Sequence, residues 1–102
     1  MRLAHQVFFT LRERTDERIE SLISDCQTYL TGHDGMLDFA VGRREPKYTR
    51  PVNADYDVAL HTVFKDQASH DAYQTASRHN EFIARQKDHW ASVQVFDSNL
   101  AD

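Results

Sequence analysis

The spacing of hydrophobic and polar positions changes several times along the chain, and each change marks an expected element. Residues 3–11 hold mostly apolar and aromatic side chains without helical spacing, which predicts a strand. From Thr15, a favourable N-cap, apolar residues recur every three or four positions, which predicts a helix that ends at Gly32. Residues 36–43 predict a second strand, which follows an Asp-Gly turn.

The second half of the chain repeats this order. The segment 44–55 contains both prolines and predicts a connecting loop, and residues 56–64 predict a third strand. Asp66 is expected to cap a helix that breaks near Ser77, and residues 91–97 predict the fourth strand. The order β-α-β-β-α-β predicts an α+β, ferredoxin-like domain over residues 1–102, with a four-stranded antiparallel sheet and the helices on one face.

Alternation along the strands predicts what each sheet face carries. The helix-facing side is expected to hold His5, Val7, Phe9, Leu11, Leu37, Phe39, Val41, Tyr56, Val58, Leu60, Phe64, Val93 and Val95. The open side is expected to hold Ala4, Gln6, Phe8, Ala40, Ala59, His61, Val63, Gln94 and Phe96. A partly aromatic face of this area is unusual in water, so we expect a homodimer that pairs through it. A monomer with a half-wet sheet is the alternative.

Composition narrows the range of partners. A formal charge of −4 gives no general attraction to nucleic acid or acidic membranes. Cys26 is the only cysteine, which excludes an intrachain disulfide and a Cys-rich zinc site, and its place on the apolar stripe of the first helix predicts a core residue. The N-terminus does not resemble a signal peptide and no stretch resembles a membrane span, so we expect a cytoplasmic protein.

Several short motifs occur in a characteristic order. They are His5-x-Val7, Phe39-x-x-Gly42, Tyr56-Asp57, Phe64-Lys65-Asp66, Tyr73…His79…Phe82 and Val95-Phe96-Asp97. From about Leu3 to Asp97 the chain thereby resembles the dimeric, stress-responsive α/β-barrel (Dabb) domain family, which implies that two sheets join into an α/β barrel. Two positions depart from the family pattern: Asp34 replaces a proline, and Ala76-Ser77 replace His-Pro.

Tyr73 and His79 are the candidate catalytic pair, with His5 directed to the same region. An imidazole titrates near neutrality, and a phenol can donate a proton or hydrogen bond to a developing oxyanion. The resemblance implies that this pair transfers protons on a phenolic, poly-carbonyl substrate, as in cyclase-like members, whose pattern carries another histidine at Val58. Walls of a small-molecule site are expected from Val7, Phe9, Tyr29, Val58, Leu60, Phe82 and Ile83.

Other functions explain the same residues. They can serve only folding and association, in a non-catalytic stress-associated dimer. The related fold also includes small monooxygenases that oxidise quinol-like substrates or haem. Whether the protein is an enzyme, and on which substrate, stays open at this stage.

The six histidines show no local metal motif, because no two lie four residues apart and no HExxH is present. We therefore expect no metal and no cofactor, and only residues from separate elements or from two subunits could assemble a site. His33 is expected in a turn, and His70 and His89 on solvated helix surfaces. Basic residues on the second strand's exit and its loop are expected to keep that loop soluble; they are Arg43, Arg44, Lys47 and Arg50.

Overall fold

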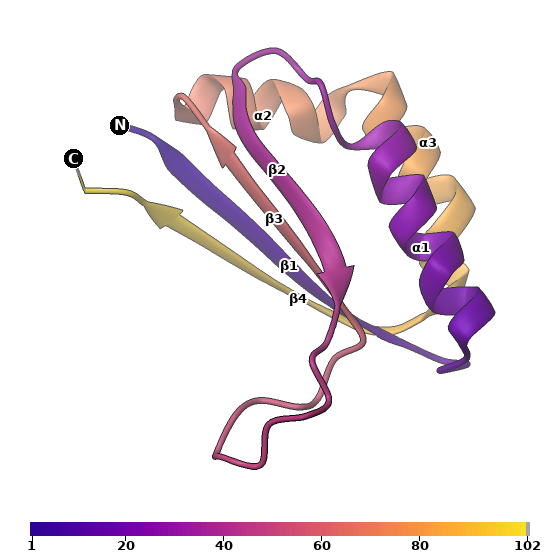
Figure 1. Cartoon of the computed structure of the whole chain (residues 1–102). Coiled ribbons are helices and arrows are strands. Elements are labelled where there is room, and N and C mark those ends of the chain that lie inside the picture. Colours follow the sequence, from indigo (N-terminus) through magenta and orange to yellow (C-terminus); the bar gives the residue numbers. More distant parts are fainter. Residues whose placement is uncertain (102) are drawn as a thin grey trace.

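The structure, a computed structural model that describes residues 1–101, consists of one antiparallel sheet covered on one face by helices (Figure 1). Asp102, the last residue of the expected domain, lies outside the described residues. The strands run in the order β2-β3-β1-β4 across the sheet. Their bounds are β1 Leu3–Leu11, β2 Met36–Arg43, β3 Val58–Phe64 and β4 Trp90–Asn99. The predicted ferredoxin-like order of elements is confirmed.

Two of the three helices begin where the sequence places capping residues. Their bounds are α1 Asp16–Tyr29, α2 Gln67–Thr75 and α3 Ser77–Gln86, and a 3₁₀ turn, Lys87–His89, leads into β4. The Thr15 side chain accepts a hydrogen bond from the Arg18 amide, and the Asp66 carboxylate accepts one from the Ser69 amide at 2.8 Å. Ala76, in an extended conformation, ends α2 and precedes α3, which is the predicted break.

The core lies between the helices and the sheet. Its buried members are Val7, Phe9, Leu11, Ile19, Leu22, Cys26, Leu30, Val58, Leu60, Phe64, Tyr73 and Phe82. Cys26 is fully buried, as expected from its helical position. Asp25 is a buried carboxylate that joins α1 to α3, because it accepts hydrogen bonds from Arg85 Nε at 3.0 Å and from Gln86 Nε2 at 2.6 Å.

Two residues do not occupy the expected sheet face. The pairing of β2 with β3 shifts register between Met36 and Asp38, and this bulge leaves Leu37 57% exposed while Met36 packs against the core. Tyr56 precedes β3 and therefore does not follow its alternation. Its ring packs on the open face against Phe8, with a distance of 5.1 Å between ring centroids. The expectation that these two residues meet the helices was wrong.

The edge strand β4 also differs from the inner strands. Val93 and Val95 pair with Phe9 and Val7 in the ladder and so share their face, but they remain 38% and 50% exposed. The sheet edge is therefore incompletely covered, and a cavity opens beneath it.

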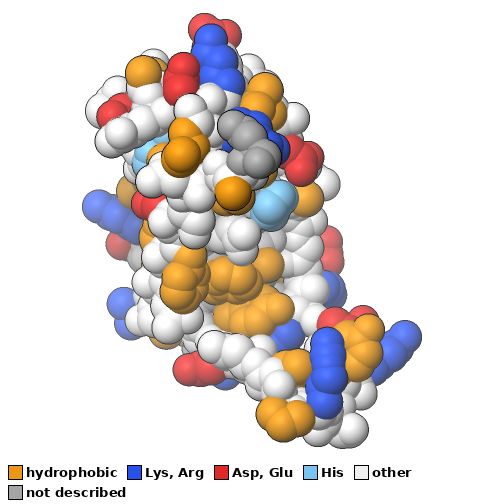
Figure 2. All heavy atoms as spheres, turned by 90° about the vertical axis from the view of Figure 1, so that its left-hand side faces the viewer, with side chains coloured by type: hydrophobic (Ala, Val, Ile, Leu, Met, Phe, Trp, Pro, Cys, Tyr) orange, Lys and Arg blue, Asp and Glu red, His pale blue; other side chains and the backbone are white. Residues whose placement is uncertain are grey.

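The opposite face carries an aromatic group that we call the open-face patch, formed by Phe8, Tyr56 and Phe96. Apolar side chains gather there over the sheet (Figure 2). Phe96 is 53% exposed, and its ring lies 5.8 Å from that of Phe8. A groove of about 240 Å³ lies at the patch and is also lined by Asn53 and Gln94. Within residues 1–101, no helix has the length and apolarity needed to cross a membrane.

Candidate functional site

A cavity of about 130 Å³ lies between the sheet and the helices, at the β4 side. Its lining residues are His5, Val7, Phe9, Leu30, Leu60, Tyr73, Gln74, His79, Phe82, Ile83, Trp90, Val93 and Val95. Most residues expected in such a site, including Tyr73, His79 and His5, thus line this one cavity. Two do not: Val58 is enclosed in the core, and Tyr29 packs beneath the guanidinium of Arg85.

Tyr73 and His79 meet across the helix break. Their ring centroids lie 4.8 Å apart in an edge-to-face arrangement. Burial raises the pKa of Tyr73, so its phenol stays protonated at neutral pH. Burial also lowers the pKa of His79, and the nearby imidazoles of His5, His33 and His70 lower it further, so the His79 imidazole is neutral at pH 7. The pair therefore offers a donor and a base side by side.

Two polar atoms of the cavity's lining residues have no partner. Nδ1 of His79 and Nε1 of Trp90 are buried, and neither has a hydrogen-bond partner among the residues that the structure describes. The indole of Trp90 is held by Phe9 and Phe82, with ring centroids at 5.0 and 5.8 Å. Buried polar atoms are paired in most folded proteins, so two unpaired ones in residues that line the same cavity are unusual.

His5 lies at the polar end of the cavity in a network with the sheet edge and α2. Its Nδ1 lies 2.5 Å from Asp97 Oδ1, the residue opposite it in the β1–β4 ladder, and 3.2 Å from Nε2 of His70. Burial lowers the pKa of His5 and outweighs the opposing effect of the Asp97 carboxylate. The contact is therefore a hydrogen bond from a neutral imidazole to a carboxylate.

His70 is not on a solvated helix surface, and that expectation was wrong. Its side chain is only 12% exposed, and its ring packs against His5 and Phe64 at centroid distances of 4.7 and 5.5 Å. The sequence did contain a signal, because His70, Tyr73 and Gln74 stand at i, i+3 and i+4 and so share one face of α2.

His33 and His89 make contacts outside this network. His33 lies in the expected turn, where its Nε2 donates to the Tyr29 carbonyl at 2.8 Å and its ring contacts that of Tyr73 from a side that does not line the cavity. His89 was expected on a solvated surface, and the structure places it half-buried. Its Nε2 lies 3.3 Å from Arg18 Nη1.

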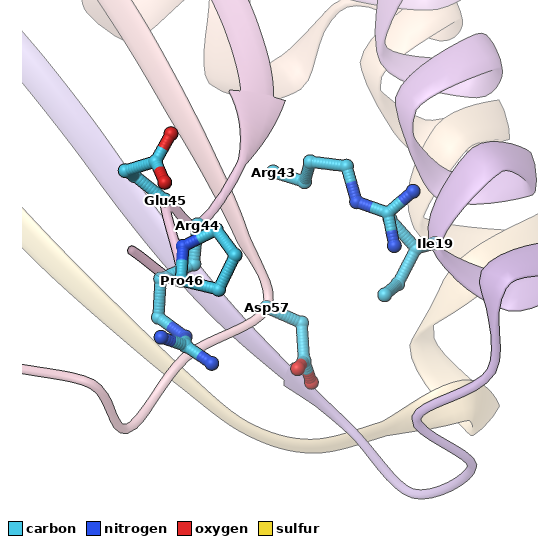
Figure 3. Close-up of a pocket in the computed structure, with 6 residues that line it drawn as sticks. All are labelled: Ile19, Arg43, Arg44, Glu45, Pro46 and Asp57. Carbon is cyan, nitrogen blue, oxygen red and sulfur yellow. The ribbon is translucent and has the colours of Figure 1, made fainter. Parts of the chain in front are cut away.

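A second hollow, of about 440 Å³, lies between α1 and the loop after β2 (Figure 3). Arg43 extends from β2 toward α1, where it pairs with Asp16 at 2.7 Å and Glu20 at 3.4 Å. On its other wall, Asp57 accepts hydrogen bonds from the Leu11 amide and from Arg14 Nε at 2.9 and 3.0 Å. Arg43 and Asp57 are thus paired with neighbouring charges, whereas Arg44, which also lines the hollow, has a buried Nε without a hydrogen-bond partner among the described residues.

The fold and cavity define a class, a small ferredoxin-like α+β protein with a pocket between sheet and helices. The family model described as the stress responsive A/B barrel domain matches residues 3–100. The chain belongs to this family, and the resemblance read from its motifs is confirmed. A search of curated protein sequences gives no match.

Solved structures of similar fold come from distant sequences. A dimeric ferredoxin-like protein of unknown function from Thermobifida fusca is 18% identical with a TM-score of 0.85, over 98% of this chain and 92% of that one. A Dabb family protein from Mesorhizobium loti is 22% identical with a TM-score of 0.80, over 99% and 98% of the two chains. The hydroxynitrile lyase of Passiflora edulis is 14% identical with a TM-score of 0.82, over 99% and 94%. At these identities the comparisons establish the fold.

Proposed function

We propose that the cavity binds a small organic molecule bearing oxygen groups and that Tyr73 and His79 carry out acid–base chemistry on it. The observation that carries this proposal is that two residues lining one cavity, His79 and Trp90, each hold a buried nitrogen, Nδ1 and Nε1, without a partner among residues 1–101. The indole N–H can only donate, so the ligand needs an acceptor such as a carbonyl or hydroxyl oxygen beside Trp90.

The cavity wall indicates the rest of the ligand. Apolar side chains supply most of it, and the polar groups gather around His5, Tyr73 and His79. Its volume of about 130 Å³ is close to that of an engineered cavity of about 150 Å³ that holds benzene. A single aromatic ring, or an aliphatic group of equal size, with one or two oxygens fits this description.

The proposed step is a proton transfer. Neutral His79 removes a proton from a hydroxyl or from a carbon next to a carbonyl, and the electron pair left behind moves onto oxygen or into the bond that forms or breaks. The protonated Tyr73 hydroxyl donates a hydrogen bond to the oxygen that gains charge. The His79 imidazolium then returns the proton to the product or leaving group. A hydroxynitrile lyase among the structures of similar fold supports a proton-transfer role for this scaffold.

Trp90 is the only tryptophan in the chain, so its indole N–H gives a single reporter resonance in a nitrogen–proton correlation spectrum. We expect members of a set of small aromatic ketones, phenols and cyanohydrins to shift this resonance saturably. His79→Phe and Tyr73→Phe should each weaken binding about 10-fold, the equivalent of one hydrogen bond of about 1.4 kcal/mol. His33→Phe is the matched control, because His33 contacts the same Tyr73 ring but does not line the cavity.

Failure of the whole set to shift the indole resonance at millimolar concentration would overturn ligand binding and leave the non-catalytic dimer as the function. Binding without turnover of any cyanohydrin or ketone in wild type would retain the ligand site and remove the catalytic step. Binding that is equally weakened by the control would mean that the variants act through packing around Tyr73.

We also propose that the protein is a homodimer paired through the open-face patch. The patch presents Phe8, Tyr56 and half-exposed Phe96 together, and a second copy would cover them. Phe96→Glu should convert a dimer to a monomer in sedimentation or light scattering. Leu37→Glu is the control, because Leu37 is as exposed as Phe96 but lies outside the patch. A wild-type monomer at micromolar concentration would refute the pairing.

The single, buried cysteine supports a cytoplasmic location.

A further inference from the structure

We propose that His5, His70 and Asp97 form a binding site for one divalent first-row transition-metal ion, such as Zn²⁺, Fe²⁺ or Co²⁺. The three residues come from β1, α2 and β4, and one ligand atom from each lies within 4.8 Å of the other two. Two imidazoles and one carboxylate are a ligand set typical of such ions, which they hold while leaving coordination positions open.

The distances between the three ligand atoms match a metal centre. Ions bound at about 2.0–2.1 Å in tetrahedral geometry hold their ligand atoms about 3.3 Å apart. Here His5 Nδ1 lies 2.5 Å from Asp97 Oδ1 and 3.2 Å from His70 Nε2, and the last two atoms are 3.9 Å apart. These values bracket the required spacing, so an ion requires the His5–Asp97 contact to open and the His70–Asp97 separation to close.

The surroundings of His70 favour an unprotonated ring nitrogen at the site. Nδ1 of His70 lies 3.5 Å from Asp71 Oδ1, which favours the tautomer with its proton on Nδ1. Nε2 is then unprotonated, and it lies 3.2 Å both from His5 Nδ1 and from the side-chain nitrogen of Gln74. A carboxylate that orients the outer nitrogen of a histidine is the usual arrangement behind a metal ligand.

Gln74 can support His5 in the same way. Its side-chain amide lies 3.5 Å from Nε2 of His5. An ion at Nδ1 of His5 would require the imidazole proton to move to Nε2, where the amide oxygen of Gln74 can accept it after rotation. Both histidines therefore have an outer partner.

The site is accessible, since the Asp97 side chain is 45% exposed at the sheet edge while both histidines are nearly buried. It also stands apart from the proposed acid–base pair, because neither His70 nor Asp97 lines the cavity. The two proposals can therefore fail separately. A bound ion would sit beside the polar end of the cavity, which His5 shares.

The test is titration of untagged, EDTA-treated protein with Zn²⁺ by calorimetry and with Co²⁺ by visible absorption. We expect one ion per chain, Co²⁺ bands of a low-symmetry site with nitrogen and oxygen ligands, and no comparable binding of Mg²⁺. His70→Leu and Asp97→Asn should each weaken Zn²⁺ binding more than about 10–100-fold, the loss that follows from removing an outer partner alone. Asp97→Asn keeps the shape and a hydrogen bond to His5, which covers the case in which His70→Leu does not fold.

His61→Leu is the matched control. His61 Nε2 and Asp38 Oδ2 form another histidine–carboxylate pair at 3.5 Å, but on the exposed surface, with the two side chains 43% and 63% exposed. Zn²⁺ binding should be unchanged in this variant. Absence of stoichiometric binding at micromolar Zn²⁺, retention of full affinity in Asp97→Asn, or loss of binding in His61→Leu would each overturn the site.

Discussion

Replacing His79 with phenylalanine should stabilise the ligand-free protein. The imidazole Nδ1 is buried without a partner among residues 1–101, and such a group costs about 1–3 kcal/mol of folding free energy. Phenylalanine removes this polar atom while keeping an aromatic ring against Tyr73, where the His79 centroid now lies 4.8 Å away. Its slightly larger ring can extend into the adjoining cavity of about 130 Å³.

We expect the free energy of unfolding to rise by about 1 kcal/mol, because packing changes around the larger ring cancel part of the gain from removing the unpaired nitrogen. For a domain of about 100 residues this corresponds to a rise in Tm of about 4–8 °C. The assay is urea unfolding at pH 8, where the imidazole is neutral, at one fixed protein concentration because association would also shift stability.

His33→Phe should change the free energy of unfolding in the opposite direction. The His33 ring also lies 4.8 Å from that of Tyr73, but its Nε2 donates to the Tyr29 carbonyl, so the same substitution should cost about 1 kcal/mol. A loss of 1 kcal/mol or more in His79→Phe would refute the reasoning, because His79 would then serve the fold rather than a ligand.

Three further outcomes follow from the burial of single groups. Burial holds the folded-state pKa of His79 below its ordinary 6.5. The stability that depends on a neutral His79 is therefore fully present above pH 6.5 and is lost as the pH falls through the folded-state pKa. His79→Phe should consequently lose less stability than wild type on acidification, measured by urea unfolding. Burial raises the pKa of Cys26 to about 12, so the native thiol should react with a thiol reagent only at the rate of unfolding, and fast labelling would contradict its burial. Asp25→Ala should cost about 1–3 kcal/mol in thermal or urea unfolding, because it removes the acceptor of Gln86 Nε2 and Arg85; an unchanged Tm would show that the α1–α3 contact is dispensable.

The sequence by itself determined the elements and most of the core. The capping residues Thr15 and Asp66, the helical stripe that contains Cys26, and the break beside Ser77 are signals between residues close in the chain. Local backbone preferences and side-chain spacing suffice to read such signals. The family motifs then added Tyr73 and His79, which the helix break does bring together.

Tertiary structure decided the features that depend on register and on packing between distant segments. One residue of slippage in the β2–β3 pairing exposed Leu37, and the irregular backbone before β3 moved Tyr56 to the open face. Neither event has a strong local signal, because a bulge depends on the partner strand.

The candidate metal site shows the same division. Each of its residues was visible in the sequence, but His5, His70 and Asp97 are separated by more than twenty positions and lie on three different elements. Their convergence required the β1–β4 register to place Asp97 opposite His5, and the packing of α2 on the sheet to bring His70 against both. Spacing along a chain describes neighbours within one element, whereas contacts among three elements are set by how the core packs.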